Sequence, residues 1–444
     1  MTRWTGWNLV SVLIAGLLSH VVAGDALSQT IRVRPGDALQ AKVEAAPAGA
    51  TVVLTTGTHQ GAMTIDKRLT IRGGSDVTLK GQAETSVITA ASDHVAVKNL
   101  TITGSGRDLG DDEAGVLVTG DHVTLDNLTL RNNLHGIYVR GGKNVTIRET
   151  QIVGLAAIEE KPAVTGQTAT QGGDGIHHNP PGAQALIGNG IHLWNAKGAA
   201  IVNNTIHDVR DGIYVAHSDQ SRFVGNKIHD GRYGIHYMYS HNNRIEGNEL
   251  WRNVAGAALM FSRNLTVQDN ILRDHSGLRA YGLLLQDVDY STFTGNTMRG
   301  NRSGLRLQNS NANTLRHNRI AGNITGITMG SASRENTLAR NRIGPNLRQL
   351  ELTGPVPPTH WSVDGKGNRW HNAMPLDLNA DGVSEWPHHE VDLVAAKRQQ
   401  FAPIQLLTGS AGIRAVEWAL SRAPVPGMRY ITDPNPLTAG GADD

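Results

Sequence analysis

The sequence predicts an all-β protein: a right-handed parallel β-helix, a solenoid of coils of about 22 residues, with a C-terminal helical extension. From Gly190 onward, a glycine that begins a short β-rich run recurs every 22 residues, apart from one step of 26 residues. An asparagine recurs with nearly the same period, and no helical periodicity interrupts the runs. The glycines are Gly190, Gly212, Gly234, Gly256, Gly282, Gly304 and Gly326, and the asparagines are Asn204, Asn226, Asn248, Asn270, Asn296, Asn318 and Asn341.

The period also predicts which residues form the core. Stacked coils lie about 4.8 Å apart, so residues one period apart lie directly above one another. Side chains alternate between the faces of a strand, so the first and third residues after each glycine share the inward face. The asparagines are expected in a turn, where stacked amides can form a ladder and tolerate unusual backbone angles. The expected core residues are Ile191, Leu193, Ile213, Val215, Ile235, Tyr237, Ala257, Leu259, Leu283, Leu285, Leu305, Leu307, Ile327 and Met329.

Residues 1–26 have the pattern of a secretory signal peptide. Arg3 supplies the basic start, Leu9–Leu18 the apolar stretch, and the small residues up to Ala26 a cleavage site. A membrane anchor is the alternative, but polar residues interrupt an apolar run that is already short for a bilayer span. The mature protein is therefore expected to be exported and soluble.

The β-helix is expected to span residues 27–350, in roughly eleven or twelve coils. Its first part follows the pattern loosely, as terminal repeats do, and Gln40–Ala46 suits a short capping helix. Residues 154–189 break the period with an insertion rich in Gly, Thr, Gln and Pro. Insertions of this kind form loops on one face of a solenoid, often the binding face.

Residues 351–444 form an expected C-terminal region with an acidic Asp-Gly box, a helix over 390–423 and a Pro-rich tail. In the box, an acidic and amide series is spaced like the oxygen ligands of a calcium loop, although His388 replaces the usual acid at the twelfth position. The alternative is a turn whose side chains satisfy its own backbone. The candidate calcium ligands are Asp377, Asn379, Asp381 and Glu385.

The outward face of the strands that follow the glycines carries a candidate metal site. His236, Met238 and Met260 should lie on one surface, with the two methionines one coil apart. Imidazole and thioether ligands without a thiolate favour Cu(I). His192 lies on the same column as His236 but two coils away, so we expect it to support the site or line the path of the metal. The alternative is that the methionines pack beneath the insertion as adaptable apolar side chains.

Other histidines are further candidates. His207 and His229 are each followed by an aspartate and stack one coil apart, so they could bind a metal with carboxylate support. Solvated turn residues are the alternative. His177 and His178 in the insertion could add ligands, or could belong to a polar loop.

Composition narrows the function classes. The net charge of +2 favours no nucleic-acid partner, and the absence of cysteine excludes a disulfide framework and a thiolate metal site. A polysaccharide-binding or polysaccharide-degrading β-helix is the competing hypothesis, but degradation requires clustered carboxylates. The outward face carries His, Met, Tyr and Gln instead.

Three motifs and the tail resemble the NosD family. The motifs begin at Gly188 (Gly-Asn-Gly-Ile-His-Leu-Trp-Asn), at Tyr233 (Tyr-Gly-Ile-His-Tyr-Met-Tyr-Ser-His-Asn-Asn-Arg) and at His275 (His-Ser-Gly-Leu-Arg-Ala-Tyr-Gly). The tail segments are the box from Asp377 and the helix from Val391. The resemblance covers nearly the whole mature chain, although Asn379 and Glu385 stand where the family usually has Asp.

The resemblance implies a periplasmic, non-enzymatic protein that handles copper during maturation of nitrous oxide reductase. The implied partners are the ATPase and membrane subunit of an ABC transporter, a copper donor chaperone and the reductase itself. The C-terminal segment is expected to dock on the transporter or to cap the last coil.

Overall fold

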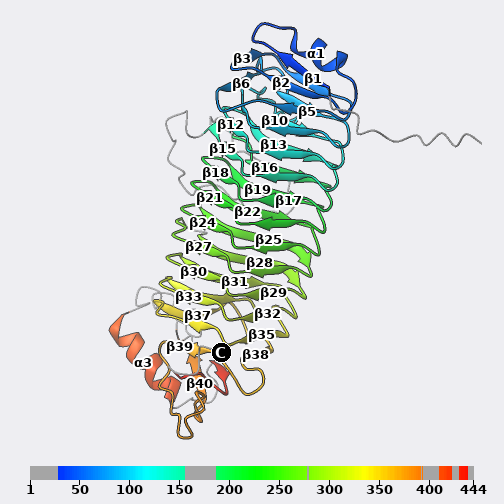
Figure 1. Ribbon diagram of the computed structural model, residues 1–444. Coiled ribbons are helices and arrows are strands. Elements are labelled where there is room, and N and C mark those ends of the chain that lie inside the picture. The colour runs from blue at the N-terminus through cyan, green and yellow to red at the C-terminus, as the bar shows by residue number, and fades with distance from the viewer. Residues whose placement is uncertain are drawn as a thin grey trace, which may run out of the picture.

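The computed structural model describes residues 29–155, 187–277, 280–391, 393, 410–422 and 430–438. The chain winds into a parallel β-helix, as the period predicted, and each full coil adds one strand to each of three sheets (Figure 1). The predicted signal peptide, His177 and His178 lie outside the described residues. Among the described helices, none combines the length and the apolar character that a bilayer span requires.

Each sheet runs the length of the rod, and the sheets hold 14, 13 and 12 strands. Sheet A contains β1 (Thr30–Val33), β2 (Thr51–Leu54), β5 (Thr70–Arg72), β8 (Ala96–Lys98), β11 (Thr124–Asp126), β14 (Thr146–Arg148), β17 (Ala200–Val202), β20 (Arg222–Val224), β23 (Arg244–Glu246), β26 (Thr266–Gln268), β29 (Thr292–Thr294), β32 (Thr314–Arg316), β35 (Asn336–Ala339) and β38 (Thr359–His360). Sheet B contains β3 (Gly57–Gln60), β6 (Val77–Lys80), β9 (Thr101–Thr103), β12 (Thr129–Arg131), β15 (Gln151–Val153), β18 (Thr205–His207), β21 (Lys227–His229), β24 (Glu249–Trp251), β27 (Ile271–Arg273), β30 (Thr297–Arg299), β33 (Arg319–Ala321), β36 (Arg342–Ile343) and β39 (Arg369–Trp370). Sheet C contains β4 (Met63–Ile65), β7 (Ile88–Ala90), β10 (Ala114–Val118), β13 (His135–Arg140), β16 (Ile191–Trp194), β19 (Asp211–Ala216), β22 (Tyr233–Met238), β25 (Ala255–Arg263), β28 (Tyr281–Asp289), β31 (Ser303–Gln308), β34 (Thr325–Met329) and β37 (Arg348–Leu352). Sheet A has 14 strands and so marks about 14 turns, of which 12 also have a strand in sheet C and are full coils. The expected eleven or twelve coils therefore omitted the partial turns at the two ends, which contain β1, β38 and β39.

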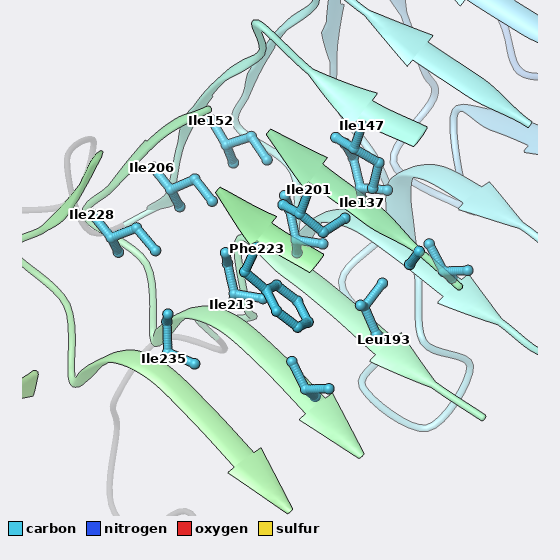
Figure 2. Close-up of a cluster of buried hydrophobic side chains, with 14 of the residues drawn as sticks. Ile137, Ile147, Ile152, Leu193, Ile201, Ile206, Ile213, Phe223, Ile228 and Ile235 are labelled. Atoms are coloured by element: carbon cyan, nitrogen blue, oxygen red, sulfur yellow. The ribbon is translucent and has the colours of Figure 1, made fainter. Parts of the chain in front are cut away.

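The core fills the space between the three sheets. Isoleucines from sheets B and C meet isoleucine and phenylalanine side chains from sheet A, one layer per coil (Figure 2). Each such side chain contributes about 1.5–3 kcal/mol by its burial. The labelled residues are Ile137, Leu193, Ile213 and Ile235 of sheet C, Ile147, Ile201 and Phe223 of sheet A, and Ile152, Ile206 and Ile228 of sheet B.

The recurring glycines allow successive coils to approach closely. A Cβ atom at Gly212 would lie 2.6 Å from the carbonyl oxygen of Gly234 on the next coil, and at Gly190 it would lie 2.6 Å from that of Gly212. No side chain fits at such distances, so the period of the glycines follows from the stacking of the backbone.

The recurring asparagines form the predicted ladder, buried at the corner between sheets A and B. In each rung the side-chain oxygen accepts hydrogen bonds from both the backbone and the side-chain nitrogen of the preceding asparagine, at 2.9 Å for Asn226 and Asn248. The unusual backbone angles, however, belong to the residue before each rung, such as Gly225 at φ 66° and Asp269 at φ 54°. The ladder continues past Asn341 to Asn368 at 2.9 Å.

The ends of the rod are closed by different elements. Helix α1 (Leu39–Ala45) packs near the first coils, close to the predicted capping helix. At the other end, β40 (His388–Val391) pairs antiparallel with β41 (Tyr430–Asp433). The predicted helix from residue 390 is therefore wrong at its start, where the chain forms a strand, and helix α3 covers Ala411–Arg422. Asp433 of β41 accepts hydrogen bonds from the backbone nitrogen of Asn368 at 2.7 Å and from the indole of Trp370 at 2.9 Å.

Candidate metal centre

Sheet C brings Met238 and Met260 together, as the period predicted. Met238 of β22 is the register partner of Met260 of β25, and His236 lies two residues before Met238 on the same strand. With Tyr214 and Ala216 of β19, the two methionines form a small apolar cluster separate from the main core. Strand alternation therefore places one imidazole and two thioethers on the outward side of two neighbouring coils.

This outward face is less open than the sequence suggested. The exposed fraction is 9% for Met238 and 4% for His192, and the side chain of His236 is 14% exposed. A metal ion bound here would be largely shielded from water. Such a site favours a soft, weakly hydrated ion.

A buried carboxylate holds His236 in place. Asp211, on the neighbouring coil, is 1% exposed, and its Oδ2 accepts a hydrogen bond from Nδ1 of His236 at 2.9 Å. Arg232 donates to both carboxylate oxygens, at 2.8 Å and 2.6 Å. Burial alone would raise the pKa of Asp211, but the charge of Arg232 and the hydrogen bonds from His236 and Arg232 lower it well below its usual range. Asp211 therefore stays ionised at neutral pH.

The ionised carboxylate fixes the tautomer of His236. A carboxylate only accepts, so Nδ1 carries the proton and Nε2 of the neutral ring keeps its lone pair. Histidines that bind metals commonly donate their other ring nitrogen to a carboxylate in this way. Asp211 was not predicted from the sequence. It directly precedes Gly212 and reaches His236 diagonally, 25 positions along the chain.

His192 lies two coils from His236, in a continuous row of rings. Its ring centroid is 4.4 Å from that of Tyr138 and 4.5 Å from that of Tyr214, and the Tyr214 ring lies 5.1 Å from that of His236. Tyr214 therefore lies between the two histidines and separates His192 from His236.

His207 and His229 stack on sheet B, away from this column. Their ring centroids are 4.9 Å apart and the rings are parallel to within 3°. Each Nδ1 bonds to the adjacent aspartate, at 2.8 Å for Asp208 and 2.7 Å for Asp230. In stacked rings the Nε2 lone pairs point in the same direction rather than toward one point, which does not suit binding of one ion by both histidines.

The Asp-Gly box forms a turn that satisfies much of its own backbone. Asp377 accepts backbone hydrogen bonds from Asp381 at 3.2 Å and Gly382 at 3.0 Å, Asn379 accepts one from Asp381, and Glu385 accepts one from Leu378. His388, at the twelfth position, is buried in β40 and bonds to Glu390 at 3.1 Å. The geometry favours the self-satisfied turn over a calcium loop.

Within the described parts of the chain, no three His, Cys, Asp or Glu side chains gather in a metal-binding group. A site of one histidine and two methionines lies outside that definition. Asp211, the carboxylate next to His236, is engaged by Arg232 and His236.

Comparisons with known proteins give consistent results. Residues 163–374 match the model of the family described as "Periplasmic copper-binding protein (NosD)". A "Probable ABC transporter binding protein NosD" from Stutzerimonas stutzeri is 31% identical over 86% of each chain. One of the same name from Pseudomonas aeruginosa is 32% identical over 86% of this chain and 87% of its own.

Solved structures share only the general architecture. The A-module of mannuronan C-5 epimerase AlgE6 from Azotobacter vinelandii is 15% identical, with a TM-score of 0.47 over 76% of this chain and 94% of that one. A family 28 exopolygalacturonase from Yersinia enterocolitica is 13% identical, with a TM-score of 0.48 over 76% of this chain and 77% of that one.

Proposed function

Because the chain belongs to the NosD family of periplasmic copper-binding proteins, we propose that it carries copper, as Cu(I), on the outward face of sheet C. His236, Met238 and Met260 are the proposed ligands. The observation that carries this proposal is the hydrogen bond from Nδ1 of His236 to the buried Asp211, which leaves Nε2 outside that bond on the strand that carries Met238, the register partner of Met260.

The ligand set favours Cu(I) over harder ions. Thioether sulfur is a soft donor that binds Cu(I), whereas calcium and magnesium require oxygen ligands. Without a thiolate, the site would bind copper weakly enough to release it to another protein. His192 would support this site or line the path by which copper enters.

We place the carrier in the periplasm, with a binding rather than a catalytic role. Its proposed partners are the ATPase and membrane subunit of an ABC transporter, a copper donor chaperone and nitrous oxide reductase, whose maturation it would supply with copper. The names of the two relatives, both probable ABC transporter binding proteins, support the transporter partner.

A titration of the purified mature protein with Cu(I) under reducing conditions tests the site, using Asp211→Asn as the variant. An amide holds the Nδ1 proton of His236 less firmly than a carboxylate does. We expect a 10–100-fold loss of Cu(I) affinity, the usual effect of removing such a partner. Asp230→Asn is the matched control, because Asp230 bonds to His229 in the same way on sheet B. A loss in the control with no loss in Asp211→Asn would move the site to the stacked histidines.

Helix α3 is the proposed contact with the transporter. Its Val416 and Trp418 are 46% and 53% exposed, although the helix packs beside β40. We expect Val416→Ser combined with Trp418→Ala to weaken co-purification with the transporter by roughly 30-fold, because a buried aromatic anchor contributes about 2 kcal/mol or more to an interface.

Point variants are preferable to removal of residues 390–444, since that deletion would also remove the strands that close the rod. Ile271→Ser combined with Tyr290→Ala removes comparable exposed apolar side chains from the middle of the rod and should leave association unchanged. If the α3 variant keeps full association while the protein remains folded, α3 is not the contact.

A further inference from the structure

Basic residues concentrate at the C-terminal end of the β-helix. Residues 299–369 contain ten arginines and one lysine against three acidic residues, a net charge of +8 in a chain whose total is only +2. The rest of the chain is therefore acidic on balance. An asymmetry of this size within one molecule indicates an electrostatic partner for the basic part.

Three of these arginines stack on sheet B. Arg319 of β33 is the register partner of Arg342 of β36, which is the register partner of Arg369 of β39. The backbones of successive rungs lie about 4.8 Å apart, so the stacked cations repel one another. Among the described residues, no ion pair reaches any of the three, and Arg319 and Arg342 are exposed. The repulsion between the stacked guanidinium groups is relieved when anions bind across them.

A second basic column flanks the first at the corner with sheet A. Arg316, Arg340 and Lys366 each lie two or three residues before one of the stacked arginines. His317 directly follows Arg316, and its pKa is lowered by burial and by the charges of Arg340 and Arg316. The charges of Arg340 and Arg316 thus both act on this corner. In the middle of the rod the same corner carries Glu246, Glu249 and Asp269 instead.

Exposed aliphatic side chains border the other edge of sheet B on two of the same coils. Ile324 follows β33 and is 51% exposed, and Leu347 follows β36 and is 48% exposed. Arginines beside isolated aliphatic side chains are typical of surfaces that rest on a membrane, where the cations meet headgroup phosphates and the apolar groups enter the interface.

We infer that this basic surface, built on Arg319, Arg342 and Arg369, binds the anionic phospholipid headgroups of a membrane. The guanidinium group matches phosphate with two parallel hydrogen bonds, and ten of the eleven basic residues in the segment are arginine rather than lysine. The inference deepens the proposed function by adding a membrane surface to the protein partners.

The position of the surface favours a membrane over a protein that exchanges copper. Arg319 lies between two and three coils beyond Met260, roughly 12 Å along the rod, and on a different sheet. With sheet B on the membrane, the methionine pair on sheet C would lie away from the lipid.

Sedimentation of the full-length mature protein with lipid vesicles tests this inference. The parent should bind vesicles that contain phosphatidylglycerol, bind pure phosphatidylcholine vesicles far more weakly, and release at high salt. Arg319→Gln, Arg342→Gln and Arg369→Gln combined should weaken binding on the order of a hundredfold, from the contribution of each basic residue near an anionic surface. The triple variant should melt no lower than the parent, since it relieves repulsion between stacked cations.

The matched control removes the same charge elsewhere: Arg148→Gln, Arg222→Gln and Arg244→Gln on sheet A. Equal losses in both triple variants would show that only net charge matters and would overturn the inference. Parent protein that binds polyglutamate but not anionic vesicles would replace the membrane by an acidic protein partner. If millimolar inorganic phosphate displaces the parent protein from the vesicles, the surface would be a site for free phosphate instead. Cu(I) titration should give parent affinity in both triple variants, so failure here is distinct from failure of the copper site.

Discussion

Replacing Met238 and Met260 together by leucine is expected to weaken Cu(I) binding by more than a hundredfold while the fold remains intact. Leucine keeps nearly the volume of methionine but has no sulfur to donate, and swaps of this kind usually cost less than about 1.5 kcal/mol. Removal of a residue that only hydrogen-bonds to a metal ligand lowers metal affinity about 10–100-fold, so removal of two direct ligands should lower it further. Competition with a Cu(I) chelator under reducing conditions measures the affinity.

Leucine variants are preferable to alanine because Met238 and Met260 pack with Tyr214 and Ala216. Alanine would leave a cavity in that cluster and would confuse lost packing with lost coordination. Met298→Leu combined with Met329→Leu is the control, since both of those methionines lie in the main core. Parent affinity in the Met238 and Met260 variant would place copper elsewhere, with His177 and His178 as the next candidates.

His275→Asn is expected to reduce the loss of stability in acid. His275 occupies a rung of a second ladder, where Asn253, Asn301 and Asn323 stand on nearby coils. Its Nδ1 accepts the backbone N–H of Asn253 at 3.3 Å, and burial lowers its pKa to about 4. Asparagine could accept the same hydrogen bond without titrating.

The direction of this pH effect on stability follows from the linkage between protonation and folding. Unfolded His275 takes up a proton below about pH 6.5, whereas the folded protein resists protonation down to about pH 4. Its stabilising effect is therefore complete above pH 6.5 and is lost as the pH falls toward 4, up to about 3 kcal/mol. Denaturant unfolding at pH 7 and pH 4 should show a smaller drop for His275→Asn than for the parent. Equal drops would mean that His275 does not titrate as its burial implies.

The regular part of the molecule could be predicted from the sequence because its physics repeats. Gly212 and Gly234 recur where coils approach too closely for a side chain. Asn226 and Asn248 recur where the side-chain amide of one asparagine donates a hydrogen bond to that of the next. The same register predicts that Met238 lies beside Met260, and the two residues are register partners. Once the period is identified, every such neighbour relation follows from counting.

What escaped prediction depends on contacts that do not repeat. Asp211 is one carboxylate in a column that elsewhere reads Asn189 and Tyr233, so the period gives no sign that it is functional. The low exposure of His192 and Met238 depends on what covers the face, which strand alternation cannot show. The strand at His388–Val391 pairs with a segment about 40 residues later, a contact without a local signal.

The place where the asparagine ladder stops has a consequence for assembly. Every rung needs an acceptor on the following coil, and the last acceptor is the side chain of Asp433, which lacks the amide N–H groups that a further rung would use. Asp433 also lies on a strand that runs antiparallel to its neighbour, so another molecule finds no parallel template there. An uncapped solenoid end exposes unpaired strand edges, and a matching strand from another molecule can pair with them and extend the array into a fibre. The ladder therefore ends on the buried side chain of Asp433, and an antiparallel strand pair rather than a further parallel coil follows it at this end of the rod.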